Sequence, residues 1–126
     1  MPRIIPTDPF WLPSPAACDA VGSALRRHPS IAFLDPGAPF NAIGCPVCGA
    51  AIAEHWWRER MEAGYDAERD AYEVLTVEPP CCGRLVSLND LAYAPPAGFA
   101  RVEVAAGPGD LARVAAALGH AVRLVT

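Results

Sequence analysis

Two short cysteine motifs carry the clearest chemical signal in the sequence. They are Cys-Pro-Val-Cys-Gly at residues 45–49 and Cys-Cys-Gly at residues 81–83. Two thiolates separated by two residues can bind one ion when the backbone between them turns tightly. A glycine after the second cysteine permits the left-handed conformation that directs backbone N–H groups at sulfur. Four sulfur ligands suit tetrahedral Zn²⁺ and leave no open position, so we expect one structural zinc ion. Its expected ligands are Cys45, Cys48, Cys81 and Cys82.

This arrangement resembles the zinc-ribbon family, in which two Cys-x-x-Cys-Gly knuckles face each other across a metal. The resemblance is limited to about residues 45–90, and the second motif departs from the pattern. Pro79 stands where the family has a cysteine, and the extra cysteine is Cys81, next to Cys82. Adjacent side chains on a strand point to opposite faces, so both can bind one ion only if the backbone bends between them. The prolines before and the glycine after favour such a bend. The alternative fourth ligand is His55.

Length and charge restrict the classes of protein that fit. A chain of 126 residues has room for one domain, and we expect residues 1–126 to form it. The formal net charge of −4 weighs against binding to nucleic acid or to an anionic membrane. We see no signal peptide and no apolar stretch that could span a bilayer, so we expect a cytoplasmic location. In that compartment, clustered cysteines more often bind metal or act in redox chemistry than form disulfides.

The two ends of the chain predict a similar succession of elements. A helix is expected from Pro15 to His28 with Ser14 as its N-cap, followed by a short buried strand at residues 31–34. Near the C-terminus we expect a strand, a helix and a strand at residues 99–105, 111–118 and 121–125. These form a βαβ unit with parallel strands and a right-handed crossover. Residues 4–12 could supply a matching first strand, which would make the chain an internal duplication.

The segment 41–90 interrupts this pattern and contains four of the five cysteines. We expect a helix at 52–61, a charged loop or helix end at 65–70, and two strands at 72–78 and 85–88 that place the second cysteine motif at a hairpin tip. The predicted fold class is therefore α+β. It comprises a small mixed sheet with helices on one face, a C-terminal βαβ unit, and a zinc-ribbon-like insert at 41–90.

The leading functional hypothesis is a non-catalytic zinc-binding protein that docks a protein partner. We find no glycine-rich phosphate loop, no His-Glu-x-x-His motif and no nucleophile elbow. The adjacent Trp56 and Trp57 could form an apolar patch for the partner, although they could equally belong to the core. Residues 80–100 resemble a segment of uncharacterised small proteins of GC-rich bacteria, which we associate with accessory or immunity-type proteins, and no activity is carried over from this resemblance.

Two alternatives come from the same segment. The Cys45–Cys48 pair precedes a helix and could act as a thiol redox couple, because a helix N-terminus lowers a thiol pKa. Zinc ribbons often bind nucleic acid, and four arginines could serve that purpose beside a tryptophan. These are Arg58, Arg60, Arg69 and Arg84. The remaining cysteine, Cys18, lies on the apolar stripe of the first helix and is expected to be a buried small hydrophobe.

Overall fold

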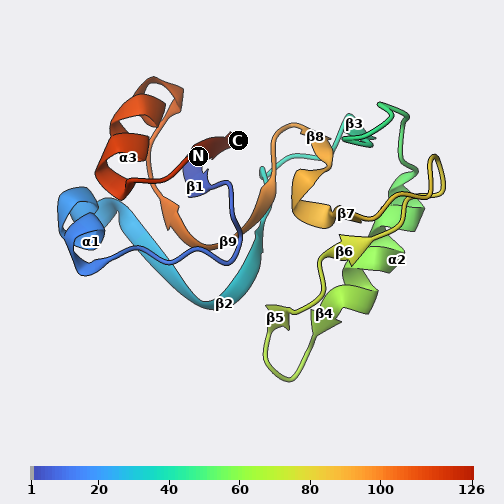
Figure 1. The fold of residues 1–126 in the computed structure, drawn as a ribbon, viewed down its shortest axis with the longest axis horizontal. Helices are drawn as coiled ribbons and strands as arrows, with labels where there is room; N and C mark the ends of the chain where they lie inside the picture. The colour runs from blue at the N-terminus through green and yellow to red at the C-terminus, as the bar shows by residue number, and fades with distance from the viewer. Residues whose placement is uncertain (1) are drawn as a thin grey trace.

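The computed structural model describes residues 2–126, and a four-stranded sheet lies at its centre (Figure 1). The strands lie in the order β10-β1-β9-β2, and each is antiparallel to its neighbours. Their bounds are Arg3–Pro6 for β1, Leu25–Leu34 for β2, Gly98–Val104 for β9 and Val122–Val125 for β10. Together with the helices described below, the sheet confirms the α+β class.

The strand order shows how the two ends of the chain fit together. Helix α1 (Pro15–Val21) connects β1 to β2, and α3 (Leu111–Leu118) connects β9 to β10. Because β9 and β10 are both antiparallel to β1, they run parallel to each other, as the predicted βαβ unit requires. They are not adjacent, however, since β1 lies between them, and in the same way β9 lies between β1 and β2. These interleaved units form the split βαβ arrangement of a ferredoxin-like topology. The helix–strand repeat noticed in the sequence therefore has a topological counterpart.

Helices α1 and α3 contact each other and lie on the same side of the sheet (Figure 1). The core between them and the sheet contains apolar residues that are almost fully buried: Ile4, Ala17, Val104, Val114 and Leu118. The expectation of helices on one face is confirmed for this pair. Among the helices of residues 2–126, none has both the length and the apolar character needed to cross a membrane.

The first helix begins as predicted and ends earlier. The Ser14 hydroxyl accepts a hydrogen bond from the Ala17 N–H at 3.1 Å, which confirms the cap. The helix ends at Val21 rather than near His28, and β2 already begins at Leu25. The reason is tertiary: residues 25–27 pair with residues 102–104 of β9, and this pairing outweighs a weak local helix preference. Pro29 falls in the irregular part of β2, where it removes no ladder hydrogen bond.

The insert leaves the sheet after β2 and returns before β9. Its neck pairs β3 (Ala42–Gly44) with β8 (Ala92–Ala94). The helix expected at 52–61 is α2 (Glu54–Gly64), and the charged loop after it is a small hairpin of β4 (Tyr65–Asp66) and β5 (Ala71–Tyr72). The expected hairpin with cysteines at its tip is present, although its strands are only β6 (Thr76–Val77) and β7 (Val86–Ser87). The one-turn helix η2 (Leu88–Asp90) follows it.

The insert and the sheet both contribute buried residues to one apolar cluster. Ile31 and Phe99 come from the sheet, whereas the insert contributes most of the other buried members. These are Ile43, Cys45, Ile52, Trp57, Met61, Leu75, Val77, Leu88, Leu91 and Tyr93. A buried polar residue of η2, Asn89, also joins the two parts, since its side chain accepts a hydrogen bond from the Phe99 N–H at 2.8 Å and donates one to the Thr7 carbonyl at 3.0 Å. The sheet therefore positions the insert that contains the cysteines.

Candidate metal centre

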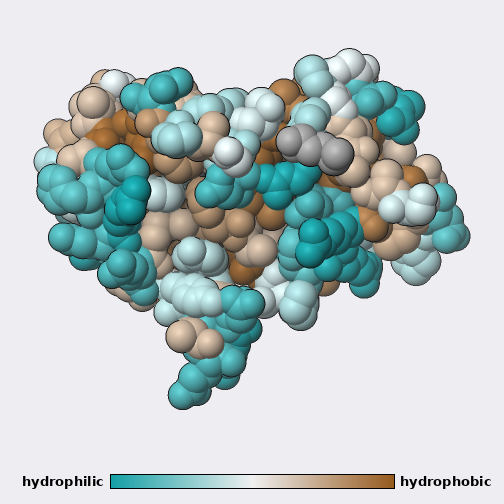
Figure 2. All heavy atoms as spheres, turned by 180° about the vertical axis from the view of Figure 1, so that it is seen from behind, coloured by the Kyte–Doolittle hydropathy of each residue, from teal (hydrophilic) through white to brown (hydrophobic). Residues whose placement is uncertain are grey.

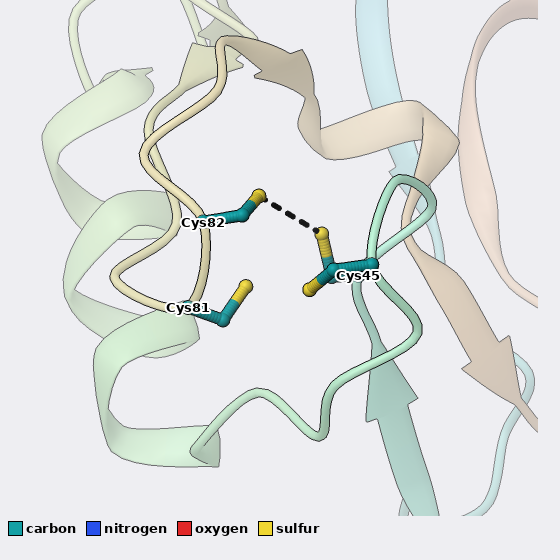
Figure 3. Close-up of side chains that lie close together, drawn as sticks. Cys45, Cys81 and Cys82 are labelled. Carbon is teal, nitrogen blue, oxygen red and sulfur yellow. Dashed lines mark hydrogen bonds between the residues drawn. The ribbon is translucent and has the colours of Figure 1, made fainter.

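Four cysteine side chains from the two predicted motifs meet in the insert. The sulfur atoms of Cys45, Cys48, Cys81 and Cys82 all lie within 4.8 Å of one another. Figure 3 shows Cys81 and Cys82 directed from the hairpin loop toward Cys45, with the Sγ atoms of Cys45 and Cys82 3.8 Å apart. In a tetrahedral site with Zn–S bonds of about 2.3 Å, the sulfur–sulfur edge is about 3.8 Å long. The geometry thus suits a single tetrahedral ion.

The first cysteine turn directly follows β3. Its backbone closes on itself, because the Cys45 N–H donates to the Ala50 carbonyl at 2.9 Å and the Gly49 N–H donates to the Cys45 carbonyl at 3.0 Å. Gly49 has φ +75°, a conformation that a side chain would strain. The backbone N–H groups of Cys48 and Val47 donate to the Cys45 sulfur and lower the pKa of this thiol to about 6. The turn therefore stabilises a thiolate at Cys45 before any ion binds.

The second turn contains the bend that two adjacent ligands require. The Gly83 N–H donates to the Pro79 carbonyl at 3.0 Å, and Gly83 has φ +66°. This tight turn brings both Cys81 and Cys82 to the cluster, although neighbours on a straight strand would point to opposite faces. The pKa of Cys81 is raised to about 12, first through its hydrogen bond to Cys48 and then through partial burial and the other sulfurs. Four thiolates in so small a volume repel one another, and a divalent cation would relieve that repulsion.

The burial of the ligands shows that the cluster lies at the surface. Cys45 is buried, with 3% of its surface exposed, whereas Cys48, Cys81 and Cys82 are exposed. Cys81 completes the four-sulfur set, and the alternative ligand His55, exposed on α2, is not among its members. Cys18 lies on α1, outside the cluster, where it is half-buried and its sulfur accepts a hydrogen bond from the Arg27 guanidinium.

The two tryptophans have different environments. Trp57 is buried with 8% exposure, its indole N–H donates to the Tyr93 hydroxyl at 3.0 Å, and it packs edge-on against Phe33 and Phe40. In this position Trp57 offers no surface to a partner, and the core interpretation applies to it. Trp56 is half-buried and lines an open groove of about 420 Å³. The hypothesis of a partner surface therefore rests on Trp56 alone.

Two of the four arginines behind the nucleic-acid alternative are paired with carboxylates. Arg58 pairs with Glu54 at 2.9 Å, and Arg69 pairs with Glu73 at 2.7 Å, as expected for solvated helix and hairpin surfaces. Helix α2 begins at Glu54, so five residues separate Cys48 from the helix N-terminus. Because the helix dipole acts mainly within the first turn, the lowered pKa of Cys45 comes from the backbone N–H groups of its own turn and not from the helix.

The structure also reveals a polar pair that the sequence could not assign. The His28 Nε2–H donates to the buried Glu103 carboxylate at 2.7 Å, and the Arg3 guanidinium lies 3.9 Å from the same carboxylate. His28 and Glu103 are 75 positions apart in the chain, and only the pairing of β2 with β9 brings them together. The alternation of Arg101 and Glu103 with apolar residues predicted a half-buried strand with Glu103 on the solvated face, and the burial of Glu103 departs from that pattern.

Comparison with known proteins found no matching family model, no similar curated protein and no similar solved structure. The function must therefore be argued from the four-cysteine cluster and the surfaces around it.

Proposed function

We propose that this chain is a non-catalytic zinc-binding protein in which the ion holds the insert in shape. The observation that carries the proposal is that four sulfur atoms lie within 4.8 Å of one another. They come from two turns that are distant in sequence, at residues 45–49 and 81–83. Soft thiolate ligands in a tetrahedral set favour Zn²⁺. Four protein ligands leave no coordination position for water or a substrate, which supports a structural role.

Elemental analysis of protein purified without added metal tests this proposal. We expect one zinc per chain in the wild type. Cys82→Ser should lose most of that zinc, and the matched control Cys18→Ser should retain it because Cys18 lies outside the cluster. A tetrathiolate iron centre would instead give iron and strong visible absorption. Iron at one per chain, or unchanged zinc in Cys82→Ser, would contradict the proposal.

We further propose that the zinc-supported insert docks a protein partner at the groove beside Trp56. Two of its lining residues, Val74 and Leu85, are exposed to 60% and 72%, which is unusual for large apolar side chains. Arg60 and Glu78 also line the groove and supply both signs of charge at its rim. A rigid apolar surface with an aromatic residue and polar surroundings is typical of a protein interface. A role as an accessory or immunity-type protein is consistent with this reading.

The docking proposal predicts that apolar contact at the groove determines partner recovery. Leu85→Asp and Trp56→Ala should each reduce the proteins captured from cells that express the tagged chain. Phe10→Asp is the matched control, because Phe10 is 61% exposed and lies outside this groove. Each variant is first assayed for zinc, so that loss of the metal centre is distinguished from loss of the surface. Equal recovery with all variants would exclude this groove as the docking site.

A further inference from the structure

A second hollow lies on the other side of the insert, between β2 and the β4–β5 hairpin. It encloses about 380 Å³, which is within the size range of small-molecule sites. Figure 2 shows a hydrophilic projection at the lower edge of the molecule, where the hairpin extends from the body. The strand contributes His28 and Phe33 to the hollow, and the hairpin region contributes Tyr65, Arg69, Asp70 and Tyr72. We call this hollow the hairpin cleft.

The hairpin cleft has aromatic walls. The rings of Tyr65 and Tyr72 lie 5.1 Å apart at an interplanar angle of 67°, and Phe33 lies on the sheet side. Aromatic faces carry negative potential and attract cations that lie within about 6 Å of a ring centre. Because the two rings pack edge to face against each other, they form one continuous aromatic wall along which an alkyl chain with a cationic head can lie.

The charge around the hairpin cleft is mainly negative. Between positions 66 and 73 the chain carries four carboxylates and one guanidinium, that of Arg69. Arg69 also lines the cleft, but its guanidinium is paired with Asp66 at 3.6 Å and with Glu73 at 2.7 Å. Asp70 lines the cleft itself, where its Oδ1 accepts the Tyr65 hydroxyl hydrogen bond. A carboxylate can accept several hydrogen bonds, so Asp70 can bind a donor in addition to Tyr65.

His28 lines the sheet side of the cleft. Its Nε2–H donates to the buried Glu103 carboxylate at 2.7 Å, which holds the ring in place. The groups left to recognise a ligand are therefore the aromatic rings and the Asp70 carboxylate. Together they are complementary to a hydrogen-bond donor that carries positive charge.

We propose that the hairpin cleft binds an organic cation, an alkylammonium group whose charge meets Asp70 and whose chain lies against Tyr65 and Tyr72. A free amine and a lysine side chain share this chemistry. The proposal stands apart from the metal centre, because none of the cleft residues belongs to the cysteine cluster.

An NMR titration of the ¹⁵N-labelled protein with n-butylammonium chloride tests the proposal. Sodium butyrate is the control, because it has the same chain length and the opposite charge. At constant ionic strength, butylammonium should give saturable shifts at residues 28–33 and 65–72, and butyrate should not. Equal or larger shifts with butyrate, or no saturable shift with butylammonium, would overturn the proposal. A capped Gly-Lys-Gly peptide separates the two sources, since its binding indicates a lysine side chain and its exclusion indicates a free amine.

Two hairpin variants separate the cleft from the general charge of the hairpin. Asp70 has φ +50°, a conformation that asparagine also tolerates, so Asp70→Asn should fold normally. We expect this variant to bind butylammonium about five-fold more weakly or worse, as loss of an ion contact in a partly enclosed site implies. Glu68→Gln removes the same charge from a hairpin residue outside the cleft lining and should change the affinity less than about two-fold. Equal weakening in both variants would show a diffuse charge effect and would overturn the assignment to the cleft.

Discussion

At the scale of single residues, the two perturbed thiols predict how zinc binding depends on protons. The pKa of Cys45 is lowered to about 6 by backbone N–H groups, so this thiol is mostly ionised at pH 7. The pKa of Cys81 is raised to about 12, so Cys81 must lose its proton when the metal binds. Zinc binding at pH 7 should therefore release fewer than four protons. Below about pH 6 Cys45 is protonated as well, and the number released should rise toward four while the affinity falls. Calorimetry in buffers of different ionisation enthalpy measures this number, and a constant value of four from pH 5 to 8 would contradict the assigned role of Cys45.

The residues of the metal centre were predictable because their chemistry is local. The tight turn at residues 45–49 depends on a cysteine spacing and on one glycine with positive φ, both of which the sequence contains. The place of Cys81 in the cluster was harder to predict, since it depends on the bend that the Gly83-to-Pro79 hydrogen bond stabilises. The hairpin cleft could not be predicted, because His28 and Tyr72 come together only through the packing of β5 against β2.

At the scale of elements, the short helix η2 determines how firmly the insert is held on the sheet. Asn89 within it is 1% exposed and bonds to Phe99, Thr7 and the Arg123 guanidinium. Asn89→Ala would leave buried donors and acceptors without partners, and we expect a loss of about 2–4 kcal/mol in the free energy of unfolding. Asn41→Ala, at an exposed position, should cost less than about 0.5 kcal/mol. Urea denaturation followed by circular dichroism measures both, and equal costs would show that η2 is not an anchor.

The elements that the sequence predicted well are those whose signals are local. Helix α3 has the expected bounds at residues 111–118 and the expected glycine after it, Gly119, with φ +71°. The end of α1 was misplaced because β2 is stabilised by its partner β9, which is about 70 residues away in sequence. The crossover helix predicted that the two C-terminal strands run parallel. The position of β1 between them depends on distant contacts and was not predicted. Propensity and spacing determine a single element, and strand order depends on contacts that no short window contains.

At the scale of the whole molecule, the two parts of the chain should respond differently to loss of the metal. A structural zinc ion contributes on the order of 10 kcal/mol in small peptides, which is comparable to the stability of a whole domain. The insert has strands of two or three residues, and the cysteine cluster connects its two turns, whereas the sheet has a further core beneath α1 and α3 besides the apolar cluster that it shares with the insert. We expect a chelator to remove hydrogen-exchange protection from residues 41–90 and to leave β1, β10 and α3 protected. Trp57 fluorescence should shift to the red, because its buried contacts with Tyr93 would be lost. Cys48→Ser should reproduce both changes without a chelator, and Cys18→Ser should show neither. Uniform loss of protection across the chain would show instead that the sheet and the insert unfold as one cooperative unit.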